Sequence, residues 1–326
     1  CIRDSTYNAP KTKVEFRGSM RKVGIIGSGN WSRALSRIFI NTEIIVKTRN
    51  IRKAKVKFSK EKSLLIVDCF EKLRNCDVIF LANTSQSMRN VLVQLPKNHN
   101  LQFVICSKGI ERKTNLLMSE ILKEYFPKSN FAVLSGPNFS FEVIKGLPTA
   151  SVISSKNSKF AANVSKIIAQ EKFRIYFNTD VIGTQIGGAM KNVVAIASGF
   201  IIGKGLGLNA NASIITRGLS EIIELGIKMG AKKNTFYGLS GIGDLSLTCS
   251  SLKSRNTKLG YLLAQQKKIV SGEVVEGMES CESICKLGKK YGVELPICNS
   301  VKKILSGQKV NKIISNLLSR PLQYEK

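Results

Sequence analysis

The stretch KVGIIGSGNWSRAL, residues 22–35, decides the fold of the first half of the chain. An apolar β-branched run leads into Gly27 and Gly29, and a helix-like pattern follows. This order is typical of the G-x-G-x-x-G turn, in which a helix N-terminus holds a pyrophosphate. Ser32 occupies the third glycine position. That position mainly serves helix–sheet packing, and a serine hydroxyl can bond back along its helix, so we expect phosphate binding to survive.

Short apolar runs alternate with helical patterns as far as about residue 180. Strands are expected at residues 23–27, 43–46, 77–82, 101–106, 131–136 and 150–154, and helix-like stretches such as 90–95 and 115–126 lie between them. Such alternation predicts an α/β fold with a doubly wound, mostly parallel sheet. The later helical patterns cover 181–202, 212–229, 258–266, 278–291 and 300–305. The sequence therefore predicts a dinucleotide-binding domain over 20–180 and an all-helical, substrate-binding domain over 181–326. Residues 1–19 are expected to be a disordered extension.

The charge of the chain favours anionic partners. The 326 residues include 51 Lys and Arg against 22 Asp and Glu, a formal net charge of +29. The lysines are scattered, and no basic stripe is interleaved with aromatic residues, so we expect no nucleic-acid partner. No uninterrupted apolar run reaches about 18 residues, so no membrane-spanning helix is expected. With no secretory signal visible either, we expect a cytoplasmic protein.

The cysteines and the single histidine limit which metal sites and acid–base catalysts the chain can contain. The eight cysteines form no C-x-x-C pair, and we expect reduced, buried thiols, with Cys281 and Cys285 on one helical face. The one histidine, His99, makes a zinc site improbable, and no metal is expected. His99 leads into a strand, which places it at the sheet edge opposite the ligand-binding edge. Acid–base chemistry therefore falls to other residue types.

A lysine lies inside the most apolar segment of the chain. Residues 181–202 are too apolar on every side for a surface helix, yet they include Lys191. Thr179 and Asp180 offer the N-cap of this helix. A buried ammonium needs a partner, and burial lowers its pKa towards values useful in catalysis. Asp244, in a glycine-flanked turn, is the expected carboxylate partner.

Two further groups of residues suit anionic ligands. Arg255 and Asn256 fit a dianionic phosphate through charge-assisted hydrogen bonds and an amide donor. About 20 residues after Gly29, where NAD-specific proteins place an acidic residue, this chain has Arg49 followed by further basic residues. A cation can pair with a 2′-phosphate but cannot accept from a ribose hydroxyl. We therefore expect NADPH to be preferred over NADH.

Several stretches together resemble the NAD(P)-dependent glycerol-3-phosphate dehydrogenases of the bacterial, cytosolic type. They are CSKGIE (106–111), SGPNFSFEV (135–143), GLPTA (146–150), DVIGTQIGGAMKNVVAIASG (180–199), GLNANASIITRGLSE (207–221), GIGDLSLTC (241–249), SRN (254–256) and VVEGMES (274–280). The resemblance extends from Met20 to about Leu318. It implies a Rossmann-like fold, an NADP(H) or NAD(H) cofactor and a homodimer. It also implies reduction of dihydroxyacetone phosphate to sn-glycerol 3-phosphate for phospholipid synthesis.

The resemblance assigns roles by position. Lys191 would be the general acid, Lys108 would polarise the carbonyl oxygen, and Asp244 would orient Lys191 and balance its charge. The implied substrate contacts are Lys108, Gly136, Asn138, Lys191, Asn192, Asp244, Thr248, Ser254, Arg255 and Asn256, the last three holding the phosphate. The cofactor contacts expected from the glycine turn and the resemblance are Gly27, Gly29, Asn30, Trp31, Arg49, Lys108, Ser140, Arg255, Val274 and Glu276.

The chain also departs from the family pattern. Ser32 replaces a glycine, residues 82–88 (ANTSQSM) lack the usual Val-Pro-Ser/Thr, residues 55–65 are short and lack a Leu-Pro stretch, and Asn138 stands where Thr is common. These departures concern cofactor affinity more than the chemistry. Three alternatives stay open. The first is a helix-lysine dehydrogenase of the 3-hydroxyacid or ketopantoate type, although the substrates of these enzymes lack a phosphate. The second is a basic nucleic-acid-binding protein on this fold. The third is a catalytically impaired metabolite-binding relative.

Overall fold

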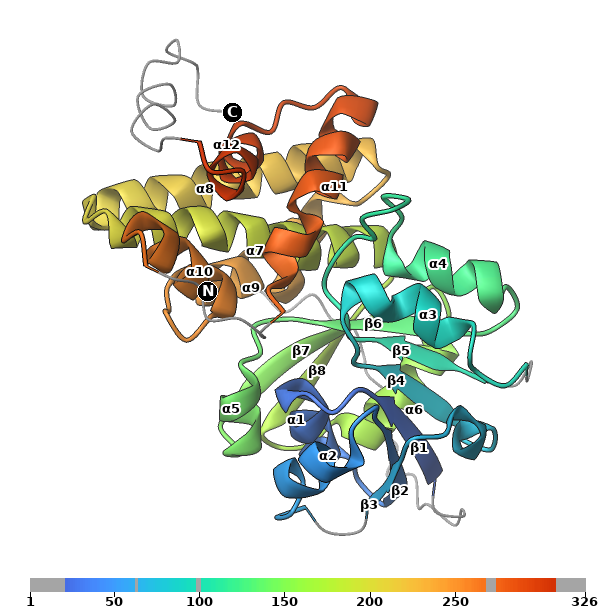
Figure 1. Ribbon diagram of the computed structural model, residues 1–326. Helices are drawn as coiled ribbons and strands as arrows, with labels where there is room; N and C mark the ends of the chain where they lie inside the picture. The colour runs from blue at the N-terminus through green and yellow to red at the C-terminus, as the bar shows by residue number, and fades with distance from the viewer. Residues whose placement is uncertain (1–20, 62–63, 98–100, 268–273, 309–326) are drawn as a thin grey trace.

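An eight-stranded sheet forms the first half of the protein. The computed structural model describes residues 21–61, 64–97, 101–267 and 274–308 (Figure 1). The strand order is β3-β2-β1-β4-β5-β6-β7-β8. The strands are β1 (Arg21–Ile26), β2 (Thr42–Lys47), β3 (Leu64–Val67), β4 (Val78–Leu81), β5 (Phe103–Ile105), β6 (Phe131–Ser135), β7 (Thr149–Ser154) and β8 (Phe173–Asn178). Every pair is parallel except β6–β7, so the predicted mostly parallel sheet is confirmed.

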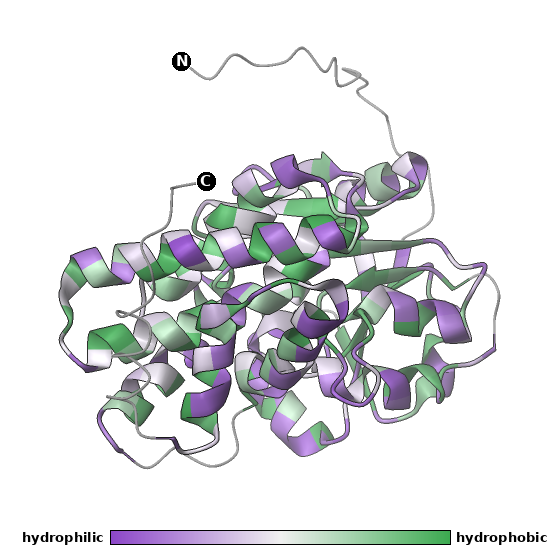
Figure 2. Cartoon of the chain, turned by 90° about the horizontal axis from the view of Figure 1, so that it is seen from above, coloured by the Kyte–Doolittle hydropathy of each residue, from purple (hydrophilic) through white to green (hydrophobic). Residues whose placement is uncertain are grey.

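Helices cover both faces of this sheet, as the continuous apolar strands require. Ile25 and Phe80 pack with α1 (Asn30–Ile38), α2 (Ile51–Lys57), α5 (Ser140–Ile144) and α6 (Ser158–Ile168). On the other face, Ile26 and Leu81 pack with α3 (Met88–Leu92), α4 (Met118–Tyr125) and the first residue of α7, Val181. Seen from above, the outer helices alternate hydrophilic and hydrophobic residues (Figure 2). Each therefore turns one apolar side to the sheet.

The described residues after β8 form helices. They are α7 (Val181–Gly203), α8 (Gly207–Lys228), α9 (Asp244–Cys249), α10 (Arg255–Ala264), α11 (Glu276–Tyr291) and α12 (Pro296–Leu305). The predicted cap of α7 is confirmed, because Asp180 Oδ1 accepts from the Gly183 amide at 2.8 Å. Nearly all of α7 is buried at the centre of the helical half. Its glycines allow close packing, since a Cβ on Gly199 would lie 1.8 Å from the Thr257 carbonyl oxygen of α10.

The apolar character of α7 has a structural cause. Among the described helices it alone has the length and hydropathy to cross a membrane, with a mean hydropathy of 1.5 over its most apolar window. However, 89% of that window is buried within the protein. The sequence analysis predicted a buried apolar helix over 181–202, and Lys191 and other polar residues interrupt its apolar run. Packing of the helical half accounts for its composition.

Three sequence expectations need correction. β3 and β8 were not predicted, because one is a four-residue strand and the other mixes buried with exposed residues. α9 was also missed, and Asp244 begins this helix instead of lying in the preceding turn. Among the described thiols, all free, Cys69 is exposed although burial was expected. His99, Met20 and residues 1–19 lie outside the described residues.

Candidate active site

Lys191 is the centre of a buried polar cluster in the helical half. Its side chain extends from α7, is 7% exposed, and donates from Nζ to Asp244 Oδ1 at 2.5 Å and to Thr248 Oγ1 at 2.8 Å. The Thr248 hydroxyl donates to the Asp244 carbonyl oxygen at 2.6 Å, so its oxygen is free to accept from the lysine. Asp244 is 1% exposed. The buried ammonium therefore has the carboxylate partner that the sequence predicted.

A second lysine reaches the same carboxylate from the sheet half. Lys108 follows β5, and its Nζ donates to Asp244 Oδ2 at 2.6 Å and to the Gly136 carbonyl oxygen at 3.1 Å. Gly136 follows β6, next to β5 in the sheet, and has a φ of +141° that favours glycine. Both residues lie at the carboxyl ends of parallel strands, where ligands bind in this class of fold. Asp244 therefore pairs with a cation of each half, and its ion pair with Lys108 joins the two halves.

The position of Asp244 depends on close backbone packing. The irregular π-helical turn Leu239–Gly243 precedes it. A Cβ on Gly241 would lie 2.1 Å from the Phe236 carbonyl oxygen, and one on Gly187 would lie 2.6 Å from that of Ser240. Only glycine permits α7 and this turn to approach so closely. π-helical turns of this kind occur frequently at functional sites.

The electrostatics of this cluster favour proton transfer near neutral pH. Burial lowers the pKa of Lys191 to about 8, an effect that Lys108 strengthens and Asp244 opposes. An amine with such a pKa changes protonation state close to physiological pH, which suits a general acid or base. The cluster can therefore deliver a proton to a carbonyl oxygen and stabilise negative charge developing there.

Two buried amides connect this cluster to α10 and α11. Asn192 Nδ2 donates to the carbonyl oxygens of Lys108 and Gly188, both at 3.2 Å. Asn256 Nδ2 donates to Asn192 Oδ1 at 2.9 Å, and Asn256 Oδ1 accepts from the Gly277 amide at 2.9 Å. Asn256 therefore retains one N–H for a ligand, beyond its bond to Asn192.

The residues expected to hold a phosphate meet at the N-terminus of α10. Ser254 caps this helix by accepting from the Thr257 amide at 3.3 Å. The Arg255 side chain is exposed and donates from Nη1 to the Val274 carbonyl oxygen at 3.0 Å. A helix N-terminus with an adjacent guanidinium is favourable for an anion.

The glycine turn has the geometry of a ligand-binding loop. Gly27 has a φ of +113°, and a Cβ there would lie 2.8 Å from the Ala82 carbonyl oxygen. Beside Gly29, nothing lies within 4 Å of the place where a side chain would begin. Asn30 and Trp31 begin α1 directly after this open space. The turn therefore fits a dinucleotide pyrophosphate.

Ser32 corrects one expectation about this turn. The residue is 0% exposed, and its hydroxyl has no hydrogen-bond partner, so it does not bond back along the helix. The reason is that α1 presents this side chain to the apolar packing between helix and sheet. An unpartnered buried hydroxyl lowers stability.

The remaining expected cofactor and substrate residues lie around the same edge. Arg49 is exposed just beyond β2, and Ser140 begins α5. Glu276, at the start of α11, accepts from the Ser85 amide at 3.0 Å and from its hydroxyl, and burial raises the pKa of this carboxyl. Asn138 is engaged with β7 through the Ala150 carbonyl oxygen and the Ser151 hydroxyl. Asn138 therefore braces the turn after β6.

The contribution of Ser85 was not recognised from the sequence. It follows β4 at the ligand-binding edge, and that position was the only available signal. A Cβ on Gly109 would lie 2.4 Å from its hydroxyl oxygen and 2.8 Å from Glu276 Oε2. Ser85, Gly109 and Glu276 thus form a tight contact between the two halves.

Two family models match the chain, one on each half. The N-terminal model of NAD-dependent glycerol-3-phosphate dehydrogenase matches residues 22–161, and the C-terminal model matches residues 180–315. The chain belongs to this dehydrogenase family. The paired match favours glycerol-3-phosphate dehydrogenase over the 3-hydroxyacid and ketopantoate types.

Individual glycerol-3-phosphate dehydrogenases are similar over nearly the whole chain. The chain is 37% identical to the enzyme named glycerol-3-phosphate dehydrogenase (NAD(P)+) of Parvibaculum lavamentivorans, over 94% of this chain and 98% of that protein. The Caulobacter vibrioides enzyme of the same name is also 37% identical, over 94% and 99%. The crystal structure of a glycerol-3-phosphate dehydrogenase from Coxiella burnetii has a TM-score of 0.85 at 27% identity, covering 93% of this chain and 100% of that one.

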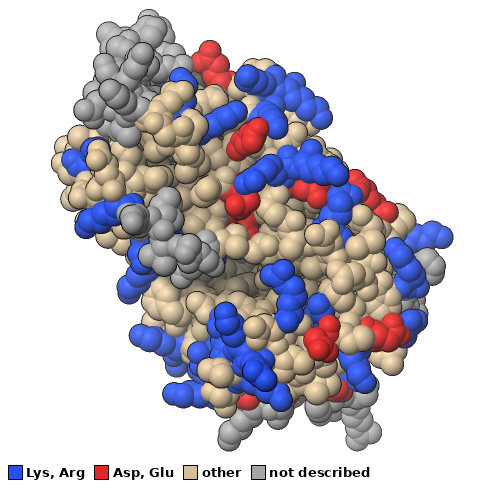
Figure 3. All heavy atoms as spheres, viewed as in Figure 1, with Lys and Arg blue, Asp and Glu red and all other residues tan. Residues whose placement is uncertain are grey.

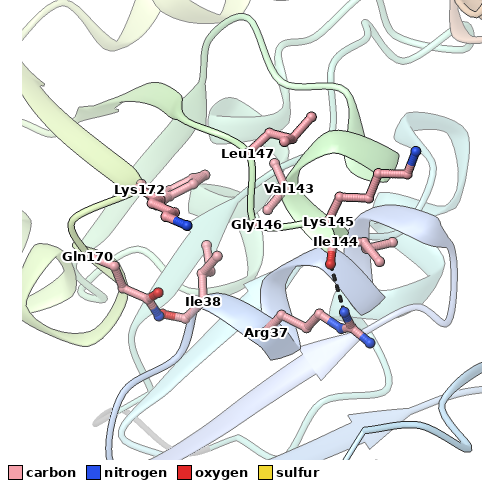
Figure 4. Close-up of a pocket in the computed structure, with 10 residues that line it drawn as sticks. Arg37, Ile38, Val143, Ile144, Lys145, Gly146, Leu147, Gln170 and Lys172 are labelled. Atoms are coloured by element: carbon pink, nitrogen blue, oxygen red, sulfur yellow. Dashed lines mark hydrogen bonds between the residues drawn. The ribbon is translucent and has the colours of Figure 1, made fainter.

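In this dehydrogenase, the surface is hollowed between the two halves, with Lys and Arg side chains along the rim (Figure 3). A separate cavity of about 270 Å³ lies between the end of α1, α5 and the start of β8. Arg37 and Ile144 line it, and Arg37 Nη1 donates to the Ile144 carbonyl oxygen at 2.7 Å (Figure 4). None of the expected site residues lines this cavity, so it is distinct from the Lys191 cluster.

Proposed function

We propose that this chain reduces dihydroxyacetone phosphate to sn-glycerol 3-phosphate, reversibly and with NAD(P)H. The observation that carries the proposal is the Asp244 carboxylate shared by Lys191 and Lys108. A ketone reductase needs a proton donor and a cation beside the carbonyl oxygen, and this cluster supplies both. Family membership supports the choice of substrate and cofactor.

The two lysines divide the work on the carbonyl group. Lys191 donates a proton to the carbonyl oxygen, and Lys108 polarises the same oxygen. Asp244 orients Lys191 and balances one of the two positive charges, while Thr248 accepts a second Lys191 N–H and leaves the third for the substrate. The nicotinamide cofactor, when bound, supplies the hydride. In the reverse reaction, neutral Lys191 accepts the hydroxyl proton.

The phosphate of the substrate is assigned to the N-terminus of α10. Arg255 contributes charge, Asn256 contributes its free N–H, and Ser254 contributes its hydroxyl. Asn192 positions Asn256 and the Lys108 backbone through its hydrogen bonds. Gly136 and Asn138 form the opposite side of the proposed substrate site. The domain over residues 181–326 would thus bind most of the substrate.

The cofactor is assigned to the domain over residues 20–180. Gly27 and Gly29 would hold the pyrophosphate, with Asn30, Trp31 and Ser140 as further contacts and Lys108 as the contact to the nicotinamide. Val274, Glu276 and Arg255 would contact the cofactor from the helical half. Arg49 lies where a 2′-phosphate would be recognised, which supports a modest preference for NADPH.

The wider context implied by the resemblance also remains a proposal. We propose a cytoplasmic homodimer that supplies sn-glycerol 3-phosphate to glycerophospholipid synthesis. We propose neither a resident metal nor a nucleic-acid partner.

One assay tests the proposed reaction. Oxidation of NADPH and of NADH is followed with dihydroxyacetone phosphate for the wild type and Lys191→Ala. We expect turnover in the wild type and a large loss in the variant. A folded wild type that binds either cofactor without turnover would overturn the proposal in favour of an impaired binding protein.

A further inference from the structure

A lysine directly before Ser254–Asn256, the three residues expected to bind the phosphate (the phosphate cluster), contacts an aromatic ring of the sheet half. Lys253 Nζ lies 4.8 Å from the ring centroid of Phe141. Lys253 belongs to the loop between α9 and α10, directly before Ser254, whereas Phe141 belongs to α5 of the sheet half. The contact therefore bridges the two halves next to the expected phosphate site.

The Phe141 ring is held in place by a neighbouring aromatic residue and by the turn after β6. Phe141 stacks on Phe139, with centroids 5.4 Å apart and an interplanar angle of 23°. Phe139 follows the Gly136–Asn138 turn, where the Gly136 carbonyl oxygen accepts from Lys108 and Asn138 is bonded to β7. The aromatic surface is consequently fixed relative to the lysine cluster.

The charges at the phosphate cluster leave a role for Lys253. A phosphate monoester carries nearly two negative charges near neutral pH. Of the three cluster residues Ser254–Asn256, only Arg255 is cationic, and the net charge of Lys108, Lys191 and Asp244 is at most +1. Within the described part of the chain, Lys253 makes no ion pair, so no carboxylate competes for its ammonium.

The contact with the ring can be exchanged for a stronger one. A cation over an aromatic ring at an exposed site contributes only about 0.5–1 kcal/mol. A charge-assisted hydrogen bond to a phosphate oxygen is roughly twice as strong as a neutral one. The flexible lysine stem allows the ammonium to move from the ring to a phosphate held by Ser254–Asn256, because Lys253 directly precedes these residues.

We propose that Lys253 is a specificity-determining residue for the substrate phosphate, and that Phe141 holds its ammonium at the cleft until the phosphate is bound. Lys253 then supplies the second positive charge that Arg255 alone does not provide. The identity of the phosphorylated substrate rests on the proposed function.

The kinetic test compares KM and kcat of variants at Lys253 and Phe141. At low ionic strength, Lys253→Gln should raise the KM for dihydroxyacetone phosphate about tenfold, in line with the loss of one charge-assisted hydrogen bond, and change kcat less than about twofold. Lys253→Arg should restore the wild-type KM, because a guanidinium serves both partners. Phe141→Leu should leave KM unchanged or lower it slightly, because the ring contact is made only in the free enzyme and competes with the phosphate for the ammonium.

Lys258→Gln is the matched control, since Lys258 is an exposed lysine one turn further along α10. Its KM should equal that of the wild type. Equal KM increases in Lys253→Gln and Lys258→Gln would overturn the proposal, because the effect would then reflect net charge alone. An unchanged KM in Lys253→Gln would overturn it as well.

A binding test separates this proposal from the proposed reaction. Titration calorimetry with inorganic phosphate, without cofactor or turnover, should show a Kd about tenfold higher for Lys253→Gln than for the wild type and Lys258→Gln. If the wild type fails to reduce dihydroxyacetone phosphate yet shows this difference, the proposed reaction fails and the role of Lys253 in phosphate binding stands. Equal phosphate affinity in all three proteins would overturn the role of Lys253.

Discussion

Lys191 donates to Asp244 across 2.5 Å in the core of the helical half. The second oxygen of this carboxylate is 2.6 Å from Lys108 Nζ, so one buried anion orients two cations. A shared partner fixes the separation of the lysines, and the proposed mechanism requires both to act on one carbonyl oxygen. Substitution of single residues in this arrangement therefore tests the proposed role of each side chain.

Removal of the Lys191 amine should abolish most of the activity. Because the general acid is lost, we expect kcat of Lys191→Ala for dihydroxyacetone phosphate reduction to fall by about 10²–10⁴. Steady-state kinetics check this, with a thermal melt to show that the variant is folded. Lys204→Ala is the control, since Lys204 is an exposed lysine at the end of α7. A variant retaining more than about a tenth of wild-type kcat would exclude Lys191 as the acid.

The pH dependence of the two directions should be opposite. Burial lowers the pKa of Lys191 to about 8 from 10.5, so its protonated form is lost as pH rises through about 8. Reduction needs that proton, and its kcat/KM should therefore fall above about pH 8. Oxidation of glycerol 3-phosphate needs the neutral amine, and its kcat/KM should rise up to the same pH. Rate profiles in both directions test this prediction, which fails if neither changes slope between about pH 7 and 9.

The charge of Arg49 should control cofactor preference. Arg49→Glu places a carboxylate where a 2′-phosphate would bind and a ribose hydroxyl could donate. We expect the ratio of kcat/KM for NADPH to that for NADH to fall by more than about tenfold, as loss of a charge-assisted contact implies. Lys55→Glu, with the same charge change at an exposed position one turn into α2, provides the comparison. If the wild type prefers NADH tenfold, the proposed NADPH preference is wrong.

Ser32 should be replaceable with a gain in stability. Its buried hydroxyl has no partner, so Ser32→Ala should raise the free energy of unfolding by about 1 kcal/mol. Denaturant unfolding measures this. Ser36→Ala on the same helix is the control, since its hydroxyl donates to the Arg33 carbonyl oxygen at 2.8 Å, and it should not stabilise. A loss of stability in Ser32→Ala would show that the hydroxyl has a favourable interaction.

Local patterns in the sequence predicted most of the fold. The glycine turn, the alternating apolar runs and the long apolar segment predicted the parallel sheet and α7, because strand and helix periodicities are properties of neighbouring residues. The same patterns missed β8 and α9, whose residues mix exposed and buried positions. The residue patterns pointed to Lys191, Asp244 and the Arg255–Asn256 pair, and the resemblance to the dehydrogenase family supplied most of the other expected site residues.

The sequence by itself therefore determined most of the strands and helices, and that a buried lysine requires a carboxylate. Only the tertiary structure decided which groups meet. Lys108 and Asp244 are 136 residues apart, and their contact depends on the backbone approach of α7 to the turn before α9. The same holds for the unpartnered Ser32 hydroxyl and for Lys253 over Phe141. Contacts between distant segments arise from the packing of whole elements, and packing is not encoded in any short stretch of the chain.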